Sequence, residues 1–195
     1  MDDEAPGWDA IEASIAERLA PASEPFHWSS GFLPDQDGLQ GISAYALQDV
    51  WFFVTFGLIE LFIKVSDEPS VSGWGFELTM RTPRAVQEEK PPQWPVVLLS
   101  RLGEFVYSRS QPFDEGHRLD PGGPITGTPG TRLTALAFTA DAQLPAVETP
   151  HGRVEFLQVV GITDEELQRM KQSSTADVLV RLRRRSQLLV TDPAR

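Results

Sequence analysis

The ten residues 72–81, SGWGFELTMR, decide the fold because their apolar and polar residues alternate. The large apolar residues are Trp74, Phe76, Leu78 and Met80. In an extended strand, a period of two places these residues on one face and Glu77, Thr79 and Arg81 on the other. This segment therefore predicts a strand in the interior of a sheet.

The segment 50–62, VWFFVTFGLIELF, is the second indication of a buried sheet. It is rich in aromatic and β-branched residues, which are enriched in strands. With short apolar runs elsewhere, it predicts strands at 42–47, 50–56, 58–63, 74–81, 133–139, 153–160 and 188–190.

Four segments have the apolar spacing and end signals of helices. The predicted helices are 8–19, 94–107, 164–171 and 175–184. Pro21 ends the first, Pro95 fits the first turn of the second, and Thr163 with Glu166 forms a capping box before the third. Turn residues predict irregular connections at 22–41, 64–72, 82–92 and 108–132.

The order of these elements predicts the fold class. Several strands follow one another directly, without the strict alternation with helices that a doubly wound fold requires. We therefore expect an α+β fold in which a mixed β-sheet sandwich is flanked by helices. No internal repeat or clear linker divides the chain, so residues 1–195 are expected to form one domain.

Composition narrows the classes of partner. The 195 residues contain 17 Lys and Arg against 28 Asp and Glu, which gives a net charge of −11. This charge repels nucleic acids and anionic membranes and favours basic partners. The longest apolar run is too short and too polar to span a bilayer, and the acidic first residues differ from a secretory signal. With no cysteine in the chain, we expect a cytoplasmic protein.

Five blocks, in order, resemble the suppressor of fused family, and specifically the N-terminal domain of its animal members. The blocks are FVTFGLIELF (53–62), SGWGFELTMR (72–81), PPQWPVVLL (91–99), TPHGRVEFLQVVGIT (149–163) and LVTD (189–192). The resemblance covers nearly all of this chain and does not include the second domain of the animal proteins. The resemblance implies a protein-binding module, because animal members hold an extended peptide of a Gli-type transcription factor as an added strand.

The same resemblance implies three partner-binding residues. The family position that lines the peptide site with a tyrosine is Phe62 here. The acidic position of the following loop falls near Pro69 in a shorter connection, and Asp67 and Glu68 are the nearest carboxylates. Phe62 lacks the tyrosine hydroxyl, which argues against a Gli-type peptide. Single-domain bacterial relatives suggest instead an immunity protein that neutralises a toxin.

No motif predicts a metal, a cofactor or a nucleic-acid site. His27, His117 and His151 lack metal-binding spacing, so solvated or capping roles are expected. The arginines at 181–185 lack the interleaved aromatic residues of a nucleic-acid surface and complement the dipole of the preceding helix.

The alternative to a binding module is an enzyme that uses carboxyl groups within strands. Glu60 and Glu77 each lie in an apolar strand segment, where an unpaired carboxylate is costly and a raised pKa suits a general acid. His117, in the long Gly/Pro-rich loop, is the third candidate. The structural interpretation of Glu77 is an ion pair with an arginine such as Arg81. A homo-oligomer built through sheet edges is a third hypothesis.

Overall fold

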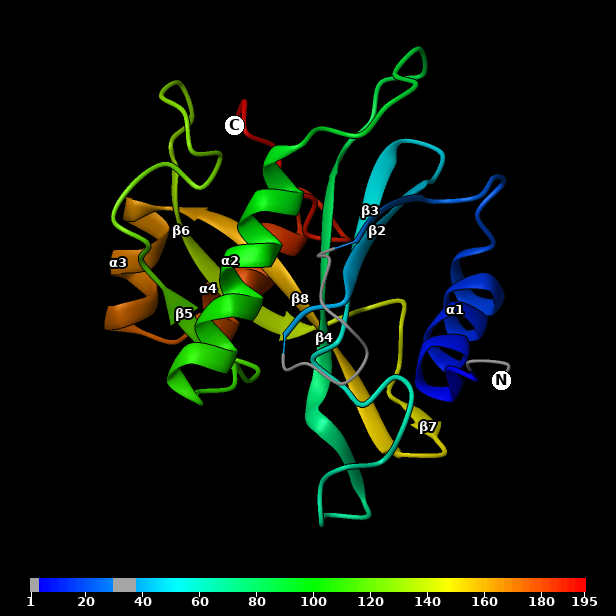
Figure 1. Ribbon diagram of the computed structural model, residues 1–195. Coiled ribbons are helices and arrows are strands. Elements are labelled where there is room, and N and C mark those ends of the chain that lie inside the picture. Colours follow the sequence, from blue (N-terminus) through cyan, green and yellow to red (C-terminus); the bar gives the residue numbers. More distant parts are fainter. Residues whose placement is uncertain (1–3, 30–37) are drawn as a thin grey trace.

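The centre of the molecule is a mixed sheet, seen in a computed structural model that describes residues 4–29 and 38–195 (Figure 1). The strand order of this part of the chain is β1-β2-β3-β4-β8-β6-β5, with β7 paired to β8. The strands are β1 (Phe26–Ser29), β2 (Gly41–Ala46), β3 (Val50–Phe56), β4 (Val71–Pro83), β5 (Arg118–Leu119), β6 (Leu133–Ala140), β7 (Val147–Thr149) and β8 (Gly152–Thr163).

The pairing of β4 with β8 makes the sheet mixed. These two strands run parallel, with Glu77 opposite Phe156 and Thr79 opposite Gln158. The other strand pairs are antiparallel. Since helices flank this sheet, the α+β class expected from the sequence is confirmed.

The helices lie where the sequence predicts them. They are α1 (Pro6–Leu19), α2 (Trp94–Arg109), α3 (Asp164–Gln172) and α4 (Thr175–Arg183). The capping box before α3 is present, because the Thr163 side chain accepts from the Glu166 N–H and the Glu166 side chain accepts from the Thr163 N–H. Helix α1 ends at Leu19, and Ala20 adopts the left-handed conformation just before Pro21.

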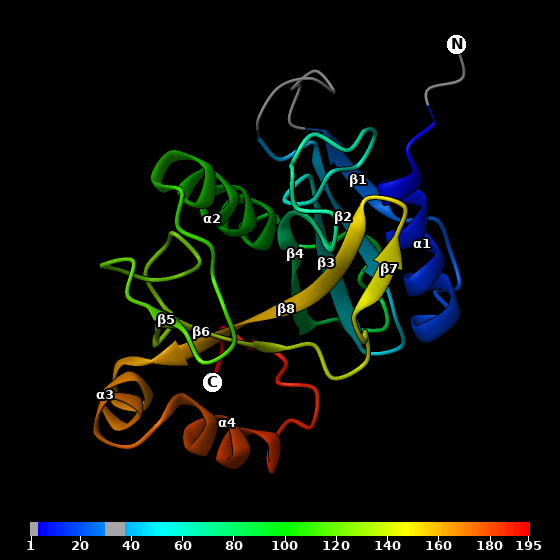
Figure 2. The same cartoon turned by 90° about the horizontal axis from the view of Figure 1, so that it is seen from below.

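The helices divide the core between the two faces of the sheet (Figures 1 and 2). Helix α2 covers one face, and its buried Leu99 and Leu102 belong to the same apolar cluster as Phe76 and Leu78 of β4. On the opposite face, α1 packs near β3, while α3 and α4 pack near β6 at the other end. Figure 2 shows α1 and the α3–α4 pair at opposite ends of the molecule.

A strip of buried polar residues crosses the second face between these two apolar clusters. We call Glu77, Thr79, Arg81, Asp141 and Gln158 the polar strip; all five are buried. Arg81 forms a bidentate ion pair with Asp141, at 2.6 Å from Nη1 and 2.9 Å from Nη2, and Thr79 donates to the same carboxylate. The prediction that Glu77 pairs with Arg81 is therefore wrong, since Asp141 occupies that guanidinium.

Two predicted strands are absent. Residues 58–63 form bends, because the N–H groups of Leu58 and Ile59 bond to the Glu77 side chain instead of a neighbouring strand. Residues 188–190 also form no strand: Leu189 has a positive φ of 51° and the carbonyl of Leu188 accepts from the Gln158 side chain.

Three short strands lie outside the predicted set. Strand β1 falls within the predicted connection 22–41 and β5 within the predicted connection 108–132, and β7 forms a hairpin with β8. Residues 30–37 of the first connection lie outside the described residues. Across the described chain, no helix combines the length and apolar character that a membrane span requires.

The Arg81–Asp141 pair predicts a large effect on stability. Burial alone would raise the pKa of Asp141, but the hydrogen bonds and charge of Arg81 hold it below its ordinary value. Removing the carboxylate in Asp141→Ala leaves a buried guanidinium unpaired, and we expect the free energy of unfolding to fall by about 3–5 kcal/mol. Urea denaturation measures this loss.

The control is Glu155→Gln, which removes an exposed ion pair with Arg153 at 3.6 Å. We expect a loss below about 1 kcal/mol there. Equal effects of the two substitutions would contradict the importance assigned to the buried pair.

Candidate functional site

The β3–β4 loop, residues 57–70, presents apolar side chains to solvent. Ile63 is 64% exposed and Val65 is 75% exposed, although both are large apolar residues. They are separated by one residue, so they form a small apolar surface on a single loop. Exposed apolar groups close together are typical of interaction sites.

A hollow of about 540 Å³ adjoins this loop. Its walls come from the loop, residues 38–40, the start of β4 and the end of α2. Trp74 and Tyr107 form an aromatic wall, with ring centroids 5.9 Å apart at an interplanar angle of 85°. The Tyr107 hydroxyl donates to the carbonyl of Gly57 and so connects α2 to the loop.

The beginning of the loop is held by a buried carboxyl group. Glu77 Oε1 accepts from the N–H groups of Gly57, Leu58 and Ile59 at 2.8, 3.0 and 3.1 Å. Gly57 has a φ of 117°, a conformation that favours glycine. Burial raises the pKa of Glu77 to about 8, even though the hydrogen bonds from Thr55 and the loop favour its charged form.

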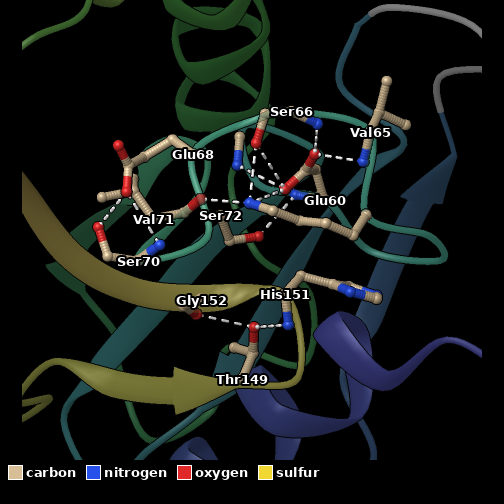
Figure 3. Close-up of polar contacts among 12 residues, drawn as sticks. Glu60, Val65, Ser66, Glu68, Ser70, Val71, Ser72, Thr149, His151 and Gly152 are labelled. Carbon is tan, nitrogen blue, oxygen red and sulfur yellow. Dashed lines mark hydrogen bonds and ion pairs between the residues drawn. The ribbon is translucent and has the colours of Figure 1, made fainter.

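The remainder of the loop is organised around a second carboxyl group, Glu60 (Figure 3). Glu60 Oε1 accepts from the N–H groups of Val65 and Ser66 at 2.6 and 2.5 Å. Its Oε2 accepts from Lys64 Nζ at 2.9 Å and from the Gly73 N–H at 3.0 Å. Burial opposes ionisation, but these bonds outweigh it and lower the pKa of Glu60 to about 2.

The three residues that the family resemblance implicates lie on this loop. Phe62 is half-buried, packs against the α1 cluster and lines the hollow. Asp67 and Glu68 are exposed and lie outside the lining of the hollow. Glu68 accepts from the N–H and the hydroxyl of Ser70, as Figure 3 shows. Their role in partner binding stays a prediction.

The three acid–base candidates do not converge. Glu60 lies in the loop, not in a strand, and Glu77 is fully buried beneath it. His117 pairs through its carbonyl with Phe138 of β6, and β8 separates β6 from β4 in the sheet. Both carboxyl groups hold backbone N–H groups, so the structure favours a positional role for them over acid–base chemistry.

The histidines lie on separate elements. His27 is in β1 and its Nδ1 lies 3.0 Å from the Ser43 hydroxyl, while His117 Nδ1 accepts from the Asp114 N–H. His151 lies in the turn between β7 and β8, where its N–H donates to Thr149 (Figure 3). Within residues 4–29 and 38–195, no group of three or more potential ligands is placed to hold a metal ion.

A larger hollow of about 740 Å³ lies between α3, α4 and the C-terminal residues. Charged residues line it, and several of them pair with each other: Arg195 with Glu166 at 2.7 Å and Arg169 with Glu165 at 2.5 Å. The β3–β4 loop is the better candidate because exposed apolar side chains adjoin its hollow.

A pattern in the sequence indicates that Ile63 and Val65 are exposed. Ile63 and Val65 alternate with Lys64 and Ser66, immediately before a run of polar residues. The sequence predicts Ile63 at the end of a strand and Val65 in the connection 64–72, and neither prediction indicates an exposed apolar surface. Trp74 and Tyr107 were predicted in a strand and a helix, but their meeting depends on the tertiary structure.

This fold and the order of its blocks define the class of protein: a mixed-sheet α+β protein of the suppressor of fused type. The model of the family described as Suppressor of fused protein (SUFU) matches residues 35–195. The human Suppressor of fused homolog is 34% identical over 140 residues, which are 68% of this chain and 28% of that protein. The chain belongs to the suppressor of fused family.

Solved structures agree with this assignment. Drosophila Suppressor of Fused superposes with a TM-score of 0.89 at 26% identity, covering 100% of this chain and 51% of that one. The Sufu chain of a Sufu–Fu complex superposes with a TM-score of 0.88 at 26% identity, covering 98% of this chain and 91% of that one. The chain thus spans a little over a quarter of the human protein and about half of the Drosophila chain.

The raised pKa of Glu77 predicts a pH dependence of stability. Its folded-state pKa of about 8 exceeds the ordinary 4.5, so the folded protein binds the proton more tightly than the unfolded chain. The contribution of Glu77 is full below pH 4.5 and is lost as the pH rises toward 8. We expect the free energy of unfolding to fall in this window by up to about 1.4 kcal/mol per pH unit.

The comparison variant is Glu77→Gln, which cannot titrate. Urea denaturation at several pH values from 4.5 to 8 gives the difference between the two proteins, and contributions from other titrating groups cancel in it. A difference that does not change with pH in this window would contradict the prediction.

Proposed function

We propose that this protein is a non-enzymatic module that binds and sequesters a protein or peptide partner through the β3–β4 loop and its adjoining hollow. The observation that supports this most is the exposure of Ile63 and Val65 on a loop whose N–H groups at 57–59, 65 and 66 are held by two buried or half-buried carboxyl groups. A surface that is already ordered loses little conformational entropy when a partner binds.

The relatives support a protein as the partner. A Sufu chain of the same fold has been crystallised in a complex with Fu, so a related chain takes part in a protein–protein assembly. In our proposal the present chain also binds a protein, and Phe62 contributes the aromatic contact at the edge of the hollow. No observation in the structure favours an enzymatic alternative.

The charge of the chain supports a basic partner. Its net charge is −11, and Asp67 and Glu68 extend the loop as exposed carboxylates next to the apolar pair. A segment with an apolar side chain flanked by Lys or Arg complements this arrangement. Acidic residues at the rim raise the association rate with such a segment more than the final affinity.

A narrower version of the proposal is that the partner is a basic toxin and that this chain is its cytoplasmic immunity protein. The net charge of −11 supports it. Co-expression of a captured partner with this chain tests the idea. Growth restored by the chain supports neutralisation, and a partner that is harmless alone contradicts it.

We also propose that residues 1–195 form one domain, since the described strands join in one sheet.

Two substitutions on the loop test the proposed surface. In Ile63→Asp and Val65→Asp, a charge replaces an exposed apolar side chain, so the fold should keep its stability to within about 0.5 kcal/mol. We expect either substitution to weaken partner binding by at least about tenfold, because it places a charge in a desolvated contact. Affinity capture followed by titration calorimetry with the captured protein measures the loss.

The matched control is Val180→Asp, which adds the same charge at a residue of α4 that is 51% exposed. A partner that binds the control and both loop variants equally well would show that the β3–β4 loop is not its binding site.

A further inference from the structure

The β3–β4 loop has almost no regular backbone pairing, and two carboxyl groups replace it. Glu77 accepts three N–H groups from the first turn of the loop, at 57–59. Glu60 accepts two from the second part, at 65 and 66, and a third from Gly73 at the start of β4. Two side chains thus satisfy six backbone N–H groups, and the proposed function has so far given neither side chain a role.

The complete burial of Glu77, with no cation beside it among the described residues, fits a neutral acid. Its Oε1 receives three N–H donors, whereas Oε2 contacts a single group, the Thr55 hydroxyl, at 2.5 Å. That hydroxyl also accepts from the Leu78 N–H at 2.8 Å, and it donates to Oε2 when Glu77 is charged. In a neutral acid the proton on Oε2 donates to the hydroxyl instead, whose own hydrogen then has the carbonyl of Leu78 at 3.4 Å as an acceptor. Among the described residues, no cation forms a hydrogen bond or ion pair with Glu77, so nothing balances a buried negative charge.

The contacts of Glu60 fit only an anion. Oε1 accepts two N–H groups, and Oε2 accepts from Lys64 and Gly73, with the Ser66 hydroxyl at 3.3 Å. A proton on either oxygen would displace one of these donors. The Lys64 ammonium, which also donates to the carbonyl of Val71, supplies the balancing charge.

We propose that Glu77 and Glu60 are the positioning residues of the binding surface and act in opposite charge states: Glu77 as a neutral acid that fixes residues 57–59, and Glu60 as an anion that fixes residues 65, 66 and 73. This inference rests on the proposed function, because it names the residues that hold the backbone of the proposed binding surface. Ile63 lies between the two groups of fixed amides along the chain, and Val65 belongs to the second group.

The surroundings of the two groups leave few other charges to influence them. Around Glu60 the charged neighbour is Lys64, and Glu68 interacts electrostatically with that lysine. Around Glu77, β3 contributes Thr55 and β8 contributes Phe156 as its opposite residue. On the same face of β4, Arg81 and Asp141 form an ion pair in which the two charges balance each other. Helix α1 approaches the loop through Gly7, whose N–H donates to the carbonyl of Leu61.

Four variants test the opposite charge states without any partner. Glutamine mimics a neutral acid, because its carbonyl accepts N–H groups and its amide donates. Glu77→Gln should therefore keep residues 57–59 in place, whereas Glu77→Leu should release them. Glu60→Gln should release either residues 65 and 66 or residue 73, because its single carbonyl oxygen cannot replace two accepting carboxylate oxygens. Glu104→Gln, at an exposed position of α2, is the matched control.

Amide hydrogen exchange, resolved by residue with NMR, gives the local readout. We expect Glu77→Leu to speed the exchange of amides 57–59 by at least about tenfold, and Glu60→Gln to speed that of amides 65 and 66 or of amide 73 by a similar factor. Exchange in β6 reports global opening and serves to normalise both effects. Amides 57–59 should also shift as the pH rises toward 8, and amides 65, 66 and 73 as it falls toward 2.

Each outcome decides the proposal. Fast exchange at 57–59 in Glu77→Gln as well as Glu77→Leu would mean that Glu77 is held as an anion. Exchange that stays slow at all of 65, 66 and 73 in Glu60→Gln would mean that Glu60 does not fix them as an anion. Either result overturns the inference. A surface that is positioned as described but captures no partner would instead contradict the proposed function alone. With a captured partner, affinity should fall at least about tenfold in Glu60→Gln and stay unchanged in Glu77→Gln.

Discussion

The parallel pairing of β4 with β8 is the constraint on which the rest of the structure depends. Strand β4 belongs to the β1–β4 half of the sheet and β8 to the other half, so this pair joins them. One face of the pair is apolar and packs under α2. The other carries the polar strip, where each buried charge needs its own partner. Arg81 finds Asp141, which lies just beyond β6, and the C-terminal residues 188–191 cover the strip by hydrogen bonding to it.

The same strand also determines the proposed binding surface. Every second residue of β4 from Glu77 to Arg81 lies on its polar face. Glu77 is the one that lies beneath the beginning of the β3–β4 loop. Its carboxyl group takes the donors that a neighbouring strand would otherwise satisfy, so the chain after β3 turns outward into a loop. That turn allows apolar side chains to reach solvent on an ordered backbone, which is an arrangement suited to holding another protein.

Local patterns in the sequence predict most of the fold, and contacts between distant residues account for what they miss. The alternation in 72–81 and the capping box at Thr163 are local and were predicted correctly. The bends at 58–63 were missed because they depend on a glutamate some twenty residues further along the chain. The aspartate that pairs with Arg81 is sixty residues away, and no short-range pattern identifies it. Family resemblance located Phe62 on the proposed surface, but the exposure of Ile63 and Val65 required coordinates.

The wall of the hollow that residues 38 and 40 form depends on a glycine in α2, which has no Cβ. Gly103, in the middle of α2, leaves a notch that the Leu39 side chain enters; a Cβ at this position would lie 2.4 Å from Leu39 Cδ1. Leu39 lies between Gly38 and Gln40, both of which line the hollow. An alanine in the helix would therefore displace this wall away from α2. The residue at position 103 of α2 thus affects the width of the hollow and the size of side chain that fits in it. The helix has this effect although only its final turn lines the hollow.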